Sequence, residues 1–534
     1  MHQENNDSKI CPICGRPTHK ESQHCIFHAV AEEKTEKEFK KALKEYINEI
    51  KEKKKDFNFK RFIFIGDINF RKDLNITVFK NAFFLIVTFK GSVSFQEATF
   101  EGSVSFQEAT FEGSVSFQEA TFEKRTSFQG ATFERSVSFQ EATFERSTSF
   151  QEANFAENAD FMIATFKGNA HFQKATFEGY AIFSEAIFER DANFENATIK
   201  GDAYFCRATF ERYTYFNKAI FERDANFENA TIKGDAYFNK ATFEGDAYFK
   251  LKCLSKTINF SEIKIFPGKI LSIKINNEGA KIYFERTYLE NIDLEMELVK
   301  NTLISFTGVL LKNTKIKKGQ IENHILQEEK KEFFEAQKIY LLLKNNFHTI
   351  GQYEDESWAF KKEKDMERLS QSFPYYKATL KNENKKESLP FLKWIQKGNF
   401  KKWITSAFSN MIYGYGEKPW NVIKTAVAII LIFALSFSFI GLGNPEIIEL
   451  KGTASHQNSG DIVDLASKGF LKNNVIRNFP DSLYFSTITF TTLGYGDFRP
   501  LEGWGRILAG SEAFIGAFMM ALFVYTFARR TGGR

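Results

Sequence analysis

Phenylalanine recurs at a fixed spacing through the first half of the chain. From Phe95 it returns every eleven residues up to Phe249, and a second series that starts at Phe100 lies between, so the local spacing alternates five and six. At about 100° per residue the two series would lie roughly 140° apart on a helix, which excludes one helical seam. Alternating Thr, Ser, Val and Phe, with Gly or Lys/Arg-Ser at turns, predicts very short strands wound into a solenoid.

The predicted solenoid is longer than its strict part. Short alternating runs begin at about Phe57, and five-residue spacing returns after a degraded patch at 251–280 and continues to about Ile325. We therefore expect a β-solenoid over 57–325, with a Phe ladder inside at the strand separation of about 4.8 Å and charged side chains outside. The open ends would expose unpaired strand groups, so the segments before and after are expected to cap them.

The repeated unit ATFEGSVSFQEATFEG resembles the Phe-centred variant of pentapeptide-repeat proteins. The resemblance implies a right-handed β-helix with about four faces per coil. A sixth residue in every second unit departs from that pattern, so we expect coils that are not perfectly square.

Helical periodicity replaces the repeat after residue 325. Residues 326–372 predict a helical hairpin interrupted at Gly351. Residues 389–411 form an amphipathic, lysine-bearing stretch with Trp394 and Trp403, which suits a helix lying along an anionic membrane surface; the alternative is a surface helix of a soluble domain.

Two segments, 421–443 and 507–528, are apolar enough to cross a membrane. Lys and Arg flank both on their outer side in the sequence, which predicts that both termini are cytoplasmic and that the connection lies outside. The N-terminus has no apolar run and no cleavage signal, so we expect a multi-pass protein of the plasma (inner) membrane with a cytosolic N-terminal region.

A short loop at 481–497 lies between these spans. Pro480-Asp481-Ser482 predicts the start of a short helix, and Thr491-Thr492-Leu493-Gly494-Tyr495-Gly496-Asp497 follows it. The two glycines permit the positive φ angles that aim alternate carbonyls inward, and the Thr492 hydroxyl adds an oxygen, so the stretch predicts an ion selectivity filter.

The order PDSLYFSTITFTTLGYGDFRP and then a second span resembles the pore region of two-transmembrane potassium channels, over about 421–530. The resemblance implies K⁺ as the permeant ion, Asp497 at the outer mouth, and a filter lined by Thr492, Leu493, Gly494, Tyr495 and Gly496. Leu493 replaces the commoner Val or Ile. One loop per chain and a ring of four imply a homotetramer.

Three further positions in this region have open interpretations. Glu512 is a charge inside a span, and it would support the pore loop, attract cations, or be a carboxylate hydrogen-bonded behind the filter. Gly510 and Gly516 are candidates for hinges or for helix packing. The other G-Y-G, 414–416, precedes the first span and is interpreted as an interfacial turn.

Residues 1–30 carry the pattern C-x2-C-x10-C-x2-H, and 31–56 predict a solvated helix. Two thiolate- and imidazole-bearing pairs at that spacing predict a closed structural zinc site with the ligands Cys11, Cys14, Cys25 and His28. His19 and His24 are competing fourth ligands. A redox or unliganded cysteine cluster and a nucleic-acid-reading finger are the alternatives.

Charge and composition narrow the functional classes. The whole chain carries +5, whereas Gly91 to Phe249 carries about −11. No paired carboxylates, nucleophile–histidine set or phosphate loop indicates an enzyme. The leading hypothesis is a potassium-selective channel gated through its cytosolic repeat; the alternatives are a membrane-tethered repeat that mimics nucleic acid or binds a partner, and a non-selective cation channel. Expected partners are membrane lipid, further copies of the chain and an unknown cytosolic ligand of the repeat, with no nucleic acid.

Overall fold

The computed structural model describes residues 10–253, 257–276, 278–382, 389–440, 442–443, 475–500 and 503–531. The chain divides into two compact units, Met1–Glu356 and Ser357–Arg534. The predicted external connection between the spans lies mostly outside the described residues, at 444–474.

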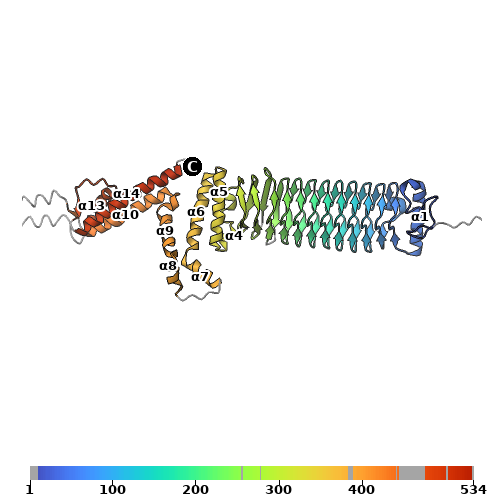
Figure 1. Ribbon diagram of the computed structural model, residues 1–534, viewed down its shortest axis with the longest axis horizontal. Helices are drawn as coiled ribbons and strands as arrows, with labels where there is room; N and C mark the ends of the chain where they lie inside the picture. The colour runs from blue at the N-terminus through green and yellow to red at the C-terminus, as the bar shows by residue number, and fades with distance from the viewer. Residues whose placement is uncertain are drawn as a thin grey trace, which may run out of the picture. The chain divides into compact units, whose positions relative to one another are not determined.

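The first unit is a β-solenoid, which confirms the predicted fold class (Figure 1). Its described residues hold 43 strands, from β1 (Phe57–Asn58) to β43 (Leu310–Lys312), most of them two residues long. From β1 to β31 each strand pairs in parallel with the fourth strand after it, as β10 (Thr110–Phe111) pairs with β14 (Thr132–Phe133); from β32 (Ala230–Ile232) onward the partner is the third strand after it. One coil therefore has four faces and returns to the same face after 22 residues, two of the eleven-residue units.

The strands lengthen where the repeat degrades in the sequence. Strands β35 (Ala247–Cys253), β38 (Ile270–Ile275) and β41 (Asp293–Leu298) pair in series and continue the solenoid through this region. Bridges Asp293↔Lys315 and Ile304↔Ile325 extend the pairing beyond β43.

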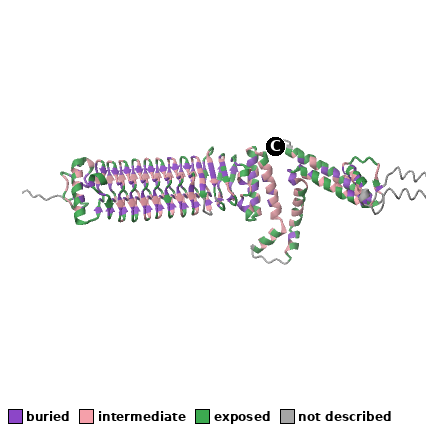
Figure 2. Ribbon diagram, turned by 180° about the vertical axis from the view of Figure 1, so that it is seen from behind, coloured by how far each residue is buried: buried purple, intermediate pink, exposed green. Residues whose placement is uncertain are grey.

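Buried residues recur along all the strands of the solenoid (Figure 2), and stacked phenylalanine rings fill its interior. Phe106, Phe128 and Phe150 are fully buried, with ring centroids 4.9 and 4.8 Å apart in successive coils and nearly parallel planes. Phe117 meets Phe128 edge-to-face at 5.4 Å. Each buried ring contributes about 1.5–3 kcal/mol before entropy, so the ladder is the main source of stability along the rod.

Each five-residue unit contains a tight turn between its strands, whereas the extra residue of the alternate units lies between Phe111 and Phe117, outside that turn. In one such turn the Ala109 N–H donates to Phe106 O at 3.1 Å, and Glu108 between them has φ +54°. Equivalent positive-φ residues recur every eleven positions, and Gly130 takes this place once, with φ +65°. Because Ala109 is fully buried beneath the turn, a bulky side chain would not fit there.

Two short helices and an amphipathic helix lie at the N-terminal end of the rod: η1 (Ala31–Glu33), α1 (Glu36–Lys53) and, within the first coil, α2 (Phe70–Leu74). Helix α1 begins with a capping box made by Thr35 and Glu38, and it buries Phe39, Leu43, Ile47 and Ile50. Phe39 packs edge-to-face on Phe64 of the first coil.

Polar groups of the first coil that have no preceding coil are paired with this cap. The Ile63 N–H donates to Phe27 O at 2.8 Å, and the buried Lys34 Nζ donates to Ile63 O at 2.6 Å. Burial lowers the pKa of Lys34 to about 8. The cap thus removes the open strand edge that a bare solenoid would present.

The opposite end is covered by α3 (Lys318–Ile321), α4 (Leu326–Glu329) and α5 (Phe333–Thr349). The Asn346 amide accepts from Thr314 N–H at 3.0 Å and donates to Thr314 O at 2.8 Å. Gln327 donates to Ser305 and Thr307 hydroxyls, both at 2.8 Å. Side-chain amides therefore replace the missing next coil.

The helices that follow are α6 (Tyr353–Ser370), α7 (Phe373–Asn382), α8 (Pro390–Gln396) and α9 (Asn399–Tyr413). The basic stretch predicted at 389–411 is thus two helices. Gly398, with φ +74°, separates them because a left-handed residue cannot continue a helix.

The pore region consists of α10 (Pro419–Ile440), α13 (Val475–Phe490) and α14 (Gly503–Thr531), with β44 (Leu442–Gly443) paired to β45 (Arg499–Pro500). Among the described helices, α10 and α14 have the length and apolar composition that a membrane crossing requires. Helix α13 begins at Val475, five residues before the predicted start at Pro480. The proline therefore lies inside the helix and does not begin it.

Candidate functional site

The pore loop follows α13 directly and is tied back to its last turn. Thr491 N–H donates to Thr487 O at 3.0 Å, and Leu493 N–H donates to Ile488 O at 2.9 Å. These bonds satisfy carbonyls that a helix end otherwise leaves free. The entry to the loop is therefore set by the position of α13.

The loop backbone is unlike a regular strand or helix. Gly494 has φ +51° and Gly496 has φ +80°, and Thr492 between helix and glycine also has φ +59°. A β-branched residue in this region is strained, which occurs where the surroundings hold the backbone in place. Thr492 Oγ1 donates to Thr491 O at 2.7 Å.

The side chains of the loop are largely uncovered in the single chain. Leu493 is 62% exposed and Tyr495 is 70% exposed. Asp497 lies beside the Tyr484 hydroxyl, which extends from α13. Tyr484 therefore supports the end of the loop.

Glu512 on α14 is fully buried among the three helices of the pore region. Its carboxylate is hydrogen-bonded to the Ser486 hydroxyl of α13, and that hydroxyl also lies 2.9 Å from Ile430 O of α10. The arrangement links all three helices behind the loop. Ser486 was not predicted as a site residue, because only the fold brings it to Glu512.

Gly516 lies where α14 packs directly against the end of α13. A Cβ atom there would lie 1.9 Å from Phe490 O, and Phe490 is the last residue of the helix before the loop. At Gly510 a Cβ atom would meet nothing within 4 Å. The structure therefore assigns helix packing to Gly516.

The second G-Y-G forms a buried turn, η2 (Gly414–Gly416), between α9 and α10. The Tyr415 hydroxyl donates to Asp365 of α6 at 3.4 Å, and Arg529 near the end of α14 donates to Tyr415 O at 3.4 Å and pairs with Glu417 at 3.2 Å. The turn thus joins α6 to the last turns of α14. Its hydrogen bonds join residues that are far apart in the sequence, so the sequence alone could not predict them.

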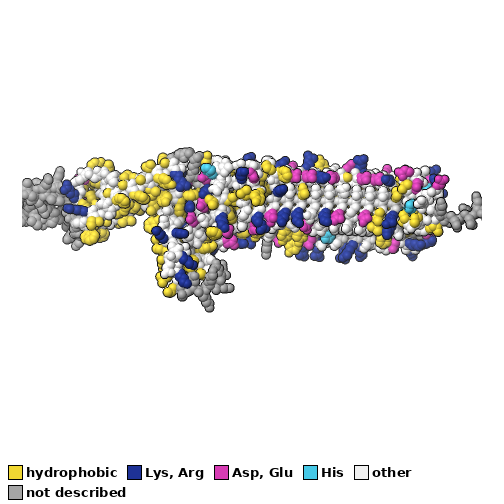
Figure 3. Space-filling view, viewed as in Figure 1, with side chains coloured by type: hydrophobic (Ala, Val, Ile, Leu, Met, Phe, Trp, Pro, Cys, Tyr) yellow, Lys and Arg dark blue, Asp and Glu magenta, His cyan; other side chains and the backbone are white. Residues whose placement is uncertain are grey.

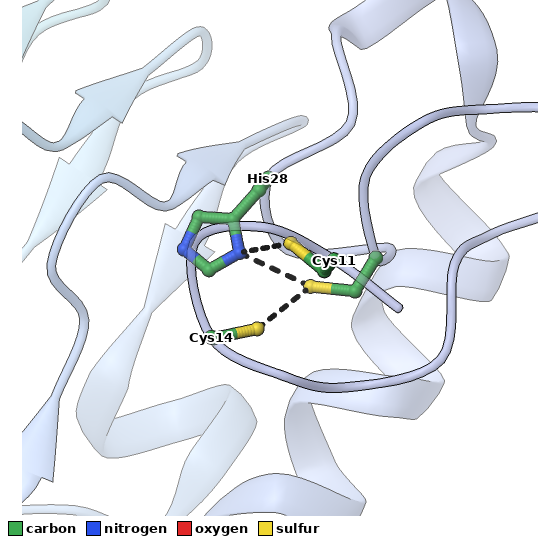
Figure 4. A group of neighbouring side chains, drawn as sticks. Cys11, Cys14 and His28 are labelled. Atoms are coloured by element: carbon green, nitrogen blue, oxygen red, sulfur yellow. Dashed lines mark hydrogen bonds between the residues drawn. The ribbon is translucent and has the colours of Figure 1, made fainter. Parts of the chain in front are cut away.

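Cys11, Cys14, Cys25 and His28 come together at the N-terminal end of the rod, and Figure 4 shows three of them pointing toward one another. Their four ligand atoms lie within 4.8 Å of one another; Cys25 Sγ is 3.1 Å and Cys11 Sγ 3.6 Å from His28 Nδ1, and Cys14 Sγ is 3.4 Å from Cys25 Sγ. His28 Nε2 lies 3.1 Å from Lys60 O, which orients the ring and leaves Nδ1 for the cluster.

The donor set fits a tetrahedral metal ion. Burial lowers the pKa of His28, which favours the neutral imidazole that binds metals, whereas burial raises the pKa of the Cys14 thiol to about 12, so a metal must displace its proton. We propose that the ion is Zn²⁺ in a structural role, because three thiolates and one imidazole close the coordination shell.

Substituting a ligand is expected to remove the metal. For Cys25→Ser we expect zinc to fall from about one ion per chain to near zero by elemental mass spectrometry, since three ligands hold Zn²⁺ far more weakly than four. Hydrogen exchange should also accelerate at 57–65, because His28 and Phe27 contact the first coil. The matched control Cys206→Ser, on a half-buried cysteine outside the cluster, should keep its zinc. A wild-type chain purified without metal would contradict the proposal.

Two parts of the chain match known protein families. Residues 456–532 match the family described as "Ion channel", and 87–132, 128–176, 172–220 and 207–250 match "Pentapeptide repeats (9 copies)". The curated relatives include the potassium voltage-gated channel protein shk-1 of Caenorhabditis elegans, 40% identical over 50 residues, and the human potassium voltage-gated channel subfamily KQT member 4, 43% identical over 61 residues. These segments cover 9% and 11% of this chain and 9% and 8% of the relatives, so the chain spans less than a tenth of their length. No solved structure matches the chain.

Proposed function

Because the chain joins a pentapeptide-repeat region to an ion-channel domain, we propose that it is a potassium-selective channel of the inner membrane. Four copies surround one pore, each giving one filter loop, Thr492–Gly496, with Asp497 at the outer mouth. K⁺ passes through this pore passively, down its electrochemical gradient. The curated relatives are named as potassium voltage-gated channels, which supports potassium as the ion.

One observation carries this proposal. The loop with positive φ at Gly494 and Gly496 follows α13 and lies between two helices, α10 and α14, each long enough to span a membrane. Lys424 precedes most of the first span, and Arg529 and Arg530 end the second, so the positive-inside tendency supports a cytoplasmic position for both ends of the pore region. The exposed Leu493 and Tyr495 are available for contact with neighbouring copies.

We assign Glu512 as a positioning residue for this loop. Its buried carboxylate is inaccessible to a passing cation in the single chain and is bonded to Ser486 instead. Through Ser486 it fixes α13 against α10, and the loop follows α13.

Reversal potentials under K⁺ and Na⁺ gradients test the proposed selectivity. A K⁺-selective pore should shift its reversal potential by about 59 mV for each tenfold change in the K⁺ gradient. A non-selective cation channel gives similar K⁺ and Na⁺ permeability and a reversal potential that does not follow K⁺ alone. The second result would overturn the potassium assignment.

The rod is proposed to regulate the pore from the cytosol. Its acidic residues are interleaved with basic ones in rows along the surface (Figure 3), and many pair between successive coils, as Lys167 with Glu145 at 2.7 Å and Arg135 with Glu157 at 2.9 Å. Exposed pairs of this kind add little stability. They do, however, interrupt the continuous negative surface that a nucleic-acid mimic needs, which favours regulation over mimicry.

Deletions of a whole coil and of half a coil separate these roles. Removing residues 115–136 deletes one coil and joins Ser114 to Val137 in unchanged register, whereas removing 115–125 deletes two faces and turns the N-terminal cap by half a coil relative to the last coil. Both should fold, because the sequence repeats every eleven residues. We expect the half-coil deletion to change single-channel open probability at least about twofold and the whole-coil deletion to leave it near wild type. Equal open probability in both would contradict a regulatory rod whose orientation matters.

A further inference from the structure

The second unit contains a cavity of about 770 Å³ between α6, α9 and α14. Four of its lining side chains are cationic: Lys364 of α6, Lys401 and Lys402 of α9, and Arg529 of α14. Hydroxyl groups from the same helices, including Ser409 and Tyr525, face the same space. Cations with hydroxyl donors around one cavity are the groups that bind phosphate oxygens.

Two of the four cations, Lys401 and Lys402, are available to bind a ligand. In the part of the chain that the structure describes, neither Lys401 nor Lys402 shows an ion pair or hydrogen bond for its ammonium group, and both are exposed. They lie in the first turn of α9, which has no acidic residue. Lysines are unfavourable at this positive end of a helix, so their placement concentrates positive potential at the cavity instead of stabilising α9.

The other two cations are partly neutralised. Lys364 pairs with Glu367 at 2.8 Å, and Arg529 pairs with Glu417 at 3.2 Å. Among the described residues, the positive charge that is not paired at the cavity is therefore that of Lys401 and Lys402.

We propose that the cavity binds a phosphate group, supplied either by an anionic phospholipid or by a small soluble phosphate compound. This inference rests on the proposed channel function for its consequence: Leu522, Tyr525 and Arg529 belong to the second span, so the occupant contacts the inner end of that span. A phosphate competes with Glu417 for Arg529. Binding of the phosphate therefore weakens the contact between Arg529 of α14 and the turn that contains Glu417. This change alters the probability that the channel opens.

The test measures phosphate binding without relying on current. The full chain is reconstituted in phosphatidylcholine with or without phosphatidylglycerol, and native mass spectrometry counts the phosphatidylglycerol retained per chain. In a second arm, inorganic phosphate is titrated by calorimetry into the chain in phosphatidylcholine alone. The cavity variant Lys401→Gln/Lys402→Gln is expected to lose at least about fivefold of the binding in one arm.

The matched control is Lys377→Gln/Lys381→Gln, which removes the same charge from exposed positions of α7 outside the cavity and should stay within about twofold of wild type. Loss confined to the cavity variant in the lipid arm identifies a phospholipid, and loss confined to it in the phosphate arm identifies a soluble ligand. Equal loss in both variants, or no binding in either arm, overturns the proposal. Reversal potentials from the same preparations distinguish the proposed channel function from the proposed phosphate site. K⁺-selective currents without phosphate binding would contradict the phosphate site and leave the channel function standing.

Discussion

Gly494→Ala is expected to abolish K⁺ selectivity, with the permeability ratio of K⁺ to Na⁺ falling toward one or the current disappearing. Gly494 has φ +51°, and a Cβ atom there costs about 1–2 kcal/mol of backbone strain. That strain would occur four times in one ring. Relaxing it requires a different backbone angle, which turns a carbonyl away from the ion path.

The effect comes from backbone conformation and not from a local clash, because a Cβ atom at Gly494 meets nothing within 4 Å in the single chain. Gly503→Ala is the matched control: it also has open space, lies at the start of α14, and has no positive φ. Reversal potentials in bilayers measure both variants. Wild-type selectivity in Gly494→Ala would remove Gly494 from the filter.

The rod was predictable from the sequence because its structure is set locally. The five-residue spacing from Phe106 to Phe111 and the six-residue spacing from Phe111 to Phe117 fix which residues face inward, and one coil then repeats the previous one. The metal cluster is similar, since Cys11 and Cys14 lie in one short turn and only the second pair must be brought to them. In both cases neighbouring residues contain most of the information.

The contacts around the pore loop depend on the fold and were not predictable. Nothing in the sequence places Ser486 beside Glu512, or Tyr415 beside Arg529, because these partners are 26 and 114 residues apart. Helix boundaries failed for a related reason. Local preference predicts a helix start at Pro480, whereas the structure continues the helix back to Val475.

Gly516→Ala is expected to reduce K⁺ current at least about tenfold, through displacement of α13. The added Cβ would lie 1.9 Å from Phe490 O, 2.7 Å from its carbonyl carbon and 3.0 Å from its Cα, all of them backbone atoms that no rotamer change can move away. Overpacking of this kind typically costs about 1–3 kcal/mol and shifts the backbone. Thr491 follows Phe490 directly, so the shift is passed to the filter.

Gly510→Ala separates packing from hinge bending in the same helix. It adds the same methyl group where nothing lies within 4 Å, and replacing a helical glycine by alanine favours the helix by about 1 kcal/mol. If α14 needs Gly516 for contact with α13 and has no hinge at Gly510, single-channel current and selectivity in Gly510→Ala stay at wild-type values while Gly516→Ala fails. Normal currents in Gly516→Ala would show that α13 and α14 are not packed this closely in the open channel. Reduced opening in Gly510→Ala with unchanged selectivity would instead assign the bend of the second span to Gly510, two residues before the buried Glu512.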